Sequence, residues 1–197
     1  MLILWDVDDV LNQLMKEWLK SWHQQEGFGR VNVSFDQLTD NPPHNQIDIS
    51  LQKYHRSLDE FRNSLTARDL IPNKQVLHWF NQHGRDHVHI ALTARPTLTM
   101  PNQAAWIYDH FGQWIQSVVA VAPARTHVDS QQHAAFQTKA AYAKWLGKPL
   151  ALIDDNQENI ASVEDICPFA LLFPQPWNSS TQTIDEALSQ LTEYLEQ

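Results

Sequence analysis

Two carboxylates stand directly after a short apolar run at the start of the chain. Residues Leu2 to Trp5 are apolar throughout, which is typical of a buried strand, and Asp6 and Asp8 follow at an i, i+2 spacing. In extended chain this spacing predicts that both side chains lie on one side of the backbone. Two like charges at the end of a buried strand are unfavourable unless a cation or a proton lies between them. The pair is therefore a candidate for chemistry.

Further polar residues occupy comparable positions later in the chain. Thr93 ends one apolar run, Asp154 and Asp155 end another, and Lys139 stands at the start of a predicted helix. Because parallel sheets bind ligands at the carboxyl ends of their strands, we expect these side chains to meet near the first two carboxylates.

The chemistry that this set favours is phosphoryl transfer. The oxygens of Asp6, Asp8 and Asp154 are hard ligands that suit Mg²⁺, retained waters and a substrate phosphate. One carboxylate can attack phosphorus, while a second carboxyl protonates the leaving oxygen and then activates water. A hydroxyl and an ammonium, here Thr93 and Lys139, can stabilise the charge on the equatorial oxygens.

The order of these residues resembles the four motifs of the haloacid dehalogenase-like (HAD) superfamily. The matching positions are Asp6-Val7-Asp8, Thr93, Lys139 and Asp154-Asp155, and the resemblance extends from residue 2 to about residue 173. It implies a Rossmann-like core with a helical cap inserted after the first motif, and a hydrolase that acts on phosphate esters.

The resemblance also implies roles for individual residues. Asp6 would be the nucleophile and Asp8 the acid/base; dehalogenase members lack an acid/base at this position, so Asp8 favours phosphate esters. Mg²⁺ would be held by Asp6, Asp154 and the backbone carbonyl of Asp8, with Asp155 nearby. The phosphoryl group would be held by Thr93, Ala94 and Lys139.

Three segments are similar to a narrower group, the cytosolic 5′(3′)-deoxyribonucleotidases. They cover residues 6–11, 105–112 and 172–178. Asp9 stands where glycine is common in that group, and Arg95-Pro96 departs from its Ser-Pro type ending. A phosphatase for a small phosphorylated metabolite is therefore the main hypothesis. A 5′-nucleotidase, and a phosphotransferase or mutase on the same scaffold, are the alternatives.

The elements that must position these residues alternate between strand and helix. Such alternation predicts an α/β fold with a three-layer, Rossmann-like parallel sheet. The predicted strands are 2–5, 87–92, 118–121, 150–153 and 169–173, and the predicted helices are 73–83, 101–111, 136–146 and one that opens with a capping box at Thr183 and Glu186.

Residues 12–69 interrupt this alternation. Apolar residues at helical spacing (Leu11, Leu14, Met15, Trp18 and Trp22) predict one helix, and Ser57 with Glu60 has the spacing of a capping box for another. We predict a core domain of residues 1–11 and 70–197 and a helical cap of residues 12–69. The cap could exclude water and contact substrate, or be a helical decoration without a role in binding.

Several residues have alternative interpretations. Lys144 competes with Lys139 as the phosphate-binding lysine, and Asp155 and Asn156 could cap the next helix. Arg95 could pair with a surface acid. Trp18 and Trp22 suit the core of the cap, while Tyr54 could line a pocket for a ring-bearing substrate. Four histidines between residues 78 and 89 do not share one helix, which disfavours zinc binding.

The composition narrows the partners and the location. The 197 residues carry a net charge of −9, which disfavours polymeric nucleic acid as a partner but allows a small phosphorylated metabolite whose charge a metal neutralises. Cys167 is the only cysteine, so no internal disulfide can form. No segment has the pattern of a signal peptide or a membrane span. We therefore expect a cytoplasmic protein that does not bind membranes; the sequence leaves its oligomeric state open.

Overall fold

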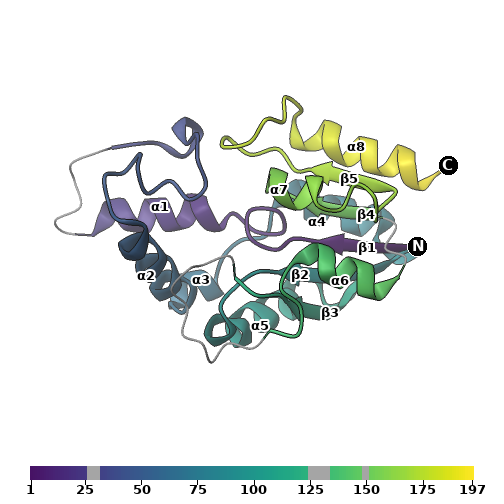
Figure 1. The fold of residues 1–197 in the computed structure, drawn as a ribbon, viewed down its shortest axis with the longest axis horizontal. Coiled ribbons are helices and arrows are strands. Elements are labelled where there is room, and N and C mark those ends of the chain that lie inside the picture. Colours follow the sequence, from purple (N-terminus) through teal and green to yellow (C-terminus); the bar gives the residue numbers. More distant parts are fainter. Residues whose placement is uncertain (26–31, 124–133, 148–150) are drawn as a thin grey trace.

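The chain forms a five-stranded sheet in which all strands are parallel, as the computed structural model shows (Figure 1). The structure describes residues 1–25, 32–123, 134–147 and 151–197. In spatial order the strands are β3 (Ile115–Ala120), β2 (Val88–Thr93), β1 (Leu2–Trp5), β4 (Ala151–Asp154) and β5 (Phe169–Leu172). The predicted α/β fold with a parallel, Rossmann-like sheet is therefore confirmed.

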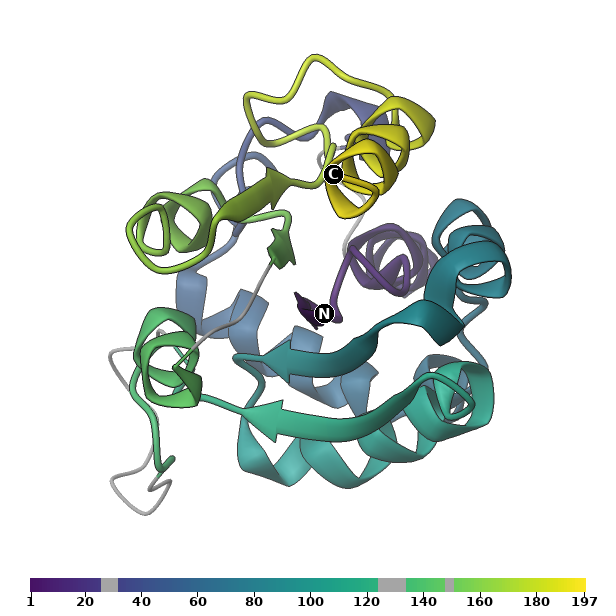
Figure 2. The same cartoon turned by 90° about the vertical axis from the view of Figure 1, so that its right-hand side faces the viewer.

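Helices cover both faces of the sheet (Figure 2). One face packs on α4 (Lys74–His83), α5 (Met100–Phe111) and α8 (Ile184–Leu195), and the other packs on α6 (Lys139–Leu146) and the segment that begins with α7 (Gln157–Ala161). Side chains of the central strand alternate between the two layers, with Ile3 and Trp5 in the first and Leu4 in the second. The three layers, with β1 at their centre, bury Ile3, Leu4 and Trp5 completely.

Between β1 and α4 the described residues form helices and no strand. The helices are α1 (Leu14–Gln24), α2 (Leu51–Arg62) and α3 (Leu65–Arg68), with a short 3-10 turn at Phe35–Gln37. They lie beyond the carboxyl end of β1 (Figure 1). The rings of Trp18 and Trp22 are 5.6 Å apart and buried, and Trp18 meets Tyr54 edge-on at 5.1 Å. These tryptophans therefore form the core of the helical segment; the division into two domains at residues 11 and 70 stays a prediction.

The predicted capping box at Ser57 is wrong. Ser57 lies inside α2, and the residue that caps this helix is Ser50, whose hydroxyl accepts the backbone N–H of Lys53. The Ser57 hydroxyl instead accepts the indole N–H of Trp18 at 3.1 Å. The spacing of Ser57 and Glu60 also occurs on one face of a helix interior, so spacing alone could not separate the two cases.

Other boundaries differ by a few residues. Helix α6 begins at Lys139 because the Thr138 hydroxyl accepts the N–H of Ala141, so Phe136 precedes the helix. Strand β3 begins at Ile115, earlier than predicted, since exposed polar residues interrupt the apolar run on this edge strand. The capping box of Thr183 and Glu186 on α8 is confirmed. Leu150, the predicted start of β4, lies outside the described residues.

His89 and Cys167 are both buried, in surroundings that suit a structural role. His89 accepts the indole N–H of Trp5 at 3.0 Å and donates to the carbonyl of Gly84 at 2.9 Å, and burial lowers its pKa to about 4. Cys167 is buried in the apolar layer beneath α6, and burial raises the pKa of its thiol to about 11. Within the described ranges, no helix is long and apolar enough to cross a membrane.

Candidate functional site

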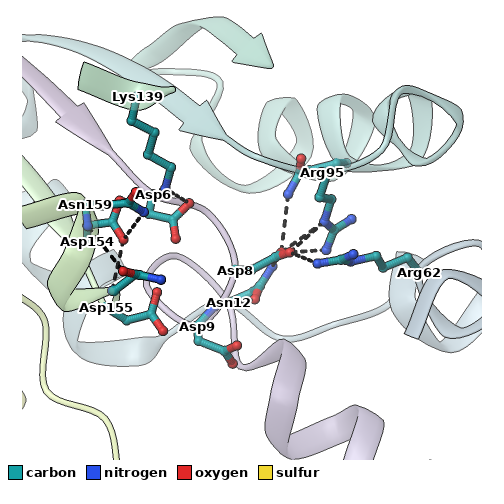
Figure 3. Close-up of polar contacts among 12 residues, drawn as sticks. Asp6, Asp8, Asp9, Asn12, Arg62, Arg95, Lys139, Asp154, Asp155 and Asn159 are labelled. Carbon is teal, nitrogen blue, oxygen red and sulfur yellow. Dashed lines mark hydrogen bonds and ion pairs between the residues drawn. The ribbon is translucent and has the colours of Figure 1, made fainter. Parts of the chain in front are cut away.

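Three neighbouring strands end at one place and deliver polar side chains there. Asp6 directly follows β1, and its backbone N–H donates to the carbonyl of Ile153 on β4 at 2.8 Å. Thr93 is the last residue of β2 and Asp154 the last residue of β4. The parallel order β2-β1-β4 therefore brings these residues to one edge of the sheet, as the sequence predicted. Figure 3 shows Asp6 and Asp154 there.

Three buried carboxylates form a cluster at this edge. Asp6, Asp154 and Asp155 each offer an oxygen within 4.8 Å of the others, and they are the one group of three or more possible metal ligands in the described part of the chain. Lys139 Nζ lies 2.6 Å from Asp6 Oδ1 and 2.7 Å from Asp154 Oδ2. One ammonium balances one of the three negative charges, so the cluster is two positive charges short of neutral when all three are ionised.

The electrostatics of the cluster reflect this shortage. Burial, with the nearby charge of Asp154, raises the pKa of Asp6 well above its usual value, although Lys139 opposes the shift. Burial and Asp154 also raise the pKa of Asp155 to about 8. Burial alone would lower the pKa of Lys139, but Asp154 and Asp6 raise it above its ordinary value. Three ionised carboxylates beside one ammonium carry a net charge of −2, which a hard divalent cation such as Mg²⁺ would neutralise.

Side chains outside the cluster hold its carboxylates in place. Asn159 Nδ2 donates to both oxygens of Asp154 at 3.1 and 3.2 Å, and the backbone N–H of Asn156 donates to Oδ1 at 3.0 Å. Trp177 Nε1 donates to Asp155 Oδ2 at 2.9 Å. Such outer hydrogen bonds orient ligand carboxylates. Asn156 also caps α7, as one of the alternative interpretations proposed.

The two candidate lysines lie in different surroundings. Lys139 is 3% exposed and contacts two of the clustered carboxylates. Lys144 lies in the last turn of α6 and is exposed to solvent. The structure therefore brings Lys139, and not Lys144, to the candidate site.

Asp8 is turned towards a different set of partners. Arg95 Nη2 lies 2.6 Å from its Oδ1 and Arg95 Nε 2.8 Å from its Oδ2, while Arg62 Nη2 lies 2.8 Å from Oδ2 (Figure 3). The expectation that Asp6 and Asp8 share one side of an extended backbone does not hold. The chain begins to turn at Val7, whose carbonyl accepts the N–H of Leu11 at 3.0 Å. The alternation of side chains between the two sides of a strand therefore ends before Asp8.

The two arginines control the charge of Asp8. Burial by itself would raise the pKa of this carboxyl, but Arg95 and Arg62 hold the pKa far below its usual range. Asp8 is therefore ionised at neutral pH in this arrangement.

Sequence reasoning missed this arginine pair. The expectation that Arg95 meets a surface acid is wrong, because Arg95 is buried and its partner is Asp8, whose side chain is only 16% exposed. No sequence pattern pointed to Arg62 as a partner of Asp8. Arg62 ends α2, far along the chain from Asp8, and only the fold brings the two residues together. The position of Arg95 two residues after Thr93 could have placed it near the strand ends.

The loop after Asp8 ties the first helix to the core. Asp9 is buried with φ of 63°, and its Oδ1 accepts the N–H of Met15 at 2.8 Å. Asn12 Oδ1 accepts the N–H groups of Asp9 and Leu14. These side chains satisfy free donors at the start of α1, where Gln13 supplies no cap. The backbone N–H of Asn73 also donates to the carbonyl of Leu11, with an N–O distance of 2.8 Å. This hydrogen bond joins the stretch of chain that enters the helical segment to the stretch that leaves it.

A cavity of about 200 Å³ opens over the cluster. The core side of its lining includes Asp6, Asp8, Thr93, Ala94 and Asp155, and the side formed by the helical segment includes Pro42, Tyr54, His55, Leu58 and Arg62. The helical segment therefore supplies part of the wall of the candidate site, as expected of a cap.

Several solved structures of similar fold are described as haloacid dehalogenase-like hydrolases, although no family model and no curated protein matches the chain. A haloacid dehalogenase-like family hydrolase from Streptococcus pneumoniae is 10% identical, with a TM-score of 0.57, and the match covers 98% of this chain and 97% of that one. A HAD-superfamily hydrolase, subfamily IA, from Geobacter sulfurreducens is 15% identical, with a TM-score of 0.52 and coverage of 96% and 95%.

A protein from Clostridium difficile that is provisionally described as a phosphatase is also similar. It is 12% identical, with a TM-score of 0.54, and the match covers 94% of this chain and 90% of that one. The matches extend over nearly the whole of each chain, so they include the helical segment as well as the sheet. The chain has the fold of the haloacid dehalogenase-like hydrolases.

Proposed function

We propose that this protein is a Mg²⁺-dependent phosphatase that hydrolyses a small phosphomonoester through a phosphorylated Asp6. One observation carries the proposal: three buried carboxylates and one ammonium meet at the strand ends, and two of these carboxylates, Asp6 and Asp155, line a cavity. The fold shared with haloacid dehalogenase-like hydrolases, including one provisionally described as a phosphatase, supports it.

In this proposal the carboxylates of Asp6, Asp154 and Asp155, with the backbone carbonyl of Asp8, hold Mg²⁺. The bound ion would neutralise and orient the oxygens of the phosphoryl group. The Thr93 hydroxyl, the Ala94 backbone and the Lys139 ammonium would bind the same group, since all three lie at this edge of the sheet. We also propose that residues 12–69 act as the cap over this site.

The reaction would proceed in two steps. A carboxylate oxygen of Asp6 attacks phosphorus, the ester P–O bond breaks, and the leaving oxygen takes a proton from Asp8. Water then attacks the phosphoryl group on Asp6 and gives a proton to Asp8, while the bond between the Asp6 oxygen and phosphorus breaks and inorganic phosphate leaves. The ionised Asp8 beside Arg62 and Arg95 suits the second step. The first step requires Asp8 to be protonated and so to loosen its contacts with the arginines.

Hydrolysis of an aryl phosphate with and without Mg²⁺ tests the proposal. We expect Mg²⁺-dependent release of phosphate by the wild type and none above background from Asp6→Asn. Asp165→Asn is a matched control on an exposed aspartate of the core and should retain activity. Absence of turnover by the wild type, or full activity of Asp6→Asn, would contradict the proposal.

Two other functions are open to test on the same scaffold. A 5′-nucleotidase would turn over nucleoside monophosphates in a substrate panel. The cavity of about 200 Å³ is smaller than typical ligand pockets, which begin at roughly 300 Å³, so it favours a substrate smaller than a nucleotide. A phosphotransferase or mutase would transfer phosphate to an added alcohol in preference to water. The similar fold of a Thermotoga maritima protein provisionally described as a beta-phosphoglucomutase, with a TM-score of 0.52 and 12% identity over 98% of both chains, motivates that test.

A further inference from the structure

Arg62 lines the cavity and lies on the other side of Asp8 from the carboxylate cluster (Figure 3). It is the last residue of α2, and it is 8% exposed. Its Nη2 donates to Asp8 and its Nη1 lies 3.1 Å from Asp59 Oδ1, while its Nε is buried without a hydrogen-bond partner. A buried guanidinium with an unused donor has remaining capacity to bind an anion.

The charges around Arg62 are unbalanced within the buried region. The side chain of Asp59 is 30% exposed, so water screens its charge. Inside the protein two guanidinium groups, those of Arg62 and Arg95, face the single carboxylate of Asp8. Arg62 is the one arginine or lysine among the described residues that line the cavity, whereas Asp6 and Asp155 give the cavity an excess of negative charge at the strand ends.

We propose that Arg62 binds a second anionic group of the substrate, a carboxylate or a phosphate a few bonds from the scissile ester. This inference rests on the proposed phosphatase function, in which the scissile phosphoryl group lies at Asp6. The planar guanidinium binds a carboxylate or phosphate through two parallel hydrogen bonds. The cavity of about 200 Å³ leaves room for a short link between the two anionic groups.

The position of Arg62 makes it a specificity residue that joins the two parts of the protein. The scissile group would contact the sheet, and the second anion would contact α2. A substrate with both groups would therefore bind across the cavity, whereas a simple alkyl ester would leave Arg62 paired with Asp8 and Asp59 alone.

Binding of two phosphonates tests the subsite without any need for catalysis. Phosphonoacetate carries a carboxylate, and isobutylphosphonate replaces its two carboxylate oxygens with methyl groups. By calorimetry with Mg²⁺ present, we expect the wild type to bind phosphonoacetate about 10–100-fold more tightly, as charge-assisted hydrogen bonds predict. Arg62→Gln should lose this preference. Equal binding of the two compounds by the wild type would overturn the proposal.

Two further variants keep the binding test specific. Arg56→Gln removes an exposed arginine from the same helix and should keep the wild-type preference for phosphonoacetate. If Arg56→Gln lost this preference, the preference would come from the overall positive charge of α2, and the subsite would be overturned. Arg62→Lys keeps the charge but not the two-point geometry, so we expect an intermediate preference. It also replaces Arg62→Gln if that variant does not give a wild-type circular dichroism spectrum.

Turnover of the matched esters separates this inference from the proposed function. We expect kcat/KM for phosphoglycolate to exceed that for isobutyl phosphate in the wild type, and the ratio to fall about 10-fold or more in Arg62→Gln, mainly through KM. Equal hydrolysis of both esters would reject the subsite and retain the phosphatase. A phosphonate preference without hydrolysis of either ester would retain the anion subsite and reject the phosphatase.

Discussion

Arg95 and Asp8 are joined by a two-point ion pair between the ends of adjacent strands. Arg95 Nη2 lies 2.6 Å from Asp8 Oδ1, and Arg95 Nε lies 2.8 Å from Asp8 Oδ2. Both residues are largely shielded from water, with the side chains 4% and 16% exposed. The carboxylate proposed as the acid/base is thus also a structural link between the segments that follow β1 and β2.

Removing one partner of this buried pair should destabilise the protein. Arg95→Gln leaves Asp8 with Arg62 as its cation, and we expect a loss of about 3 kcal/mol in the free energy of unfolding at pH 7. Urea unfolding measures it, and Arg85→Gln, on an exposed arginine, should have little effect.

The same variant has a defined pH dependence. The arginines lower the pKa of Asp8 in the folded state, so their stabilisation is present above the unfolded pKa of about 3.9 and is lost as the pH falls towards the folded pKa. The difference between wild type and Arg95→Gln should therefore shrink below about pH 4. A difference that is equally large at pH 3 and pH 7 would contradict the assigned ion pair.

Metal-free protein should lose stability as the pH rises between about 4 and 8. The pKa of Asp155 is raised to about 8 in the folded state, so in this range the folded state binds more protons than the unfolded state, and raising the pH favours unfolding. Mg²⁺ should raise the melting temperature more at pH 8 than at pH 5. Asp155→Asn should flatten the metal-free profile. A similar effect of Mg²⁺ at both pH values would argue against a metal site that includes Asp155.

Lys139 and Lys144 should behave differently when each is replaced by methionine. Lys139→Met removes the ammonium between Asp6 and Asp154, so we expect loss of phosphate release and a free energy of unfolding lower by about 3 kcal/mol without metal. Lys144→Met changes an exposed side chain on the same helix and should affect neither measurement. Retained activity in Lys139→Met would remove this lysine from the proposed site.

Trp177→Phe should weaken metal binding without removing a ligand. The indole N–H orients Asp155 through a hydrogen bond of 2.9 Å, and loss of such an outer contact costs about 10–100-fold in metal affinity. Titration of activity against Mg²⁺ concentration measures the change. Trp145→Phe, on an exposed tryptophan, is the control. An unchanged Mg²⁺ requirement would mean that this hydrogen bond does not orient a metal ligand.

The sheet and the carboxylate cluster could be predicted because both depend on short-range patterns. Apolar runs followed by Asp6, Thr93 and Asp154 are visible in the sequence, and a parallel sheet brings the ends of such runs together. Lys139 could be preferred over Lys144 because the start of a helix lies near the strand ends.

The arginine pair and the caps of the helical segment could not be predicted in the same way. Arg62 is 54 residues from Asp8, and no periodicity connects them. Ser57 matches the spacing of a capping box, but its hydroxyl accepts a hydrogen bond from Trp18, a residue of another helix. In both cases tertiary contacts, rather than local preference, decide which partner a polar side chain has.

The hydrogen bonds at the base of the helical segment limit how that segment can move. Asp9 and Asn12 bind the first N–H groups of α1, and Leu11 is joined to Asn73. A swing of the whole segment about its two connections would break these bonds together. Opening of the cavity would therefore come from local separation of α2 from the sheet. In hydrogen–deuterium exchange, the amides of Met15 and Asn73 would then be protected for longer than those at the end of α2.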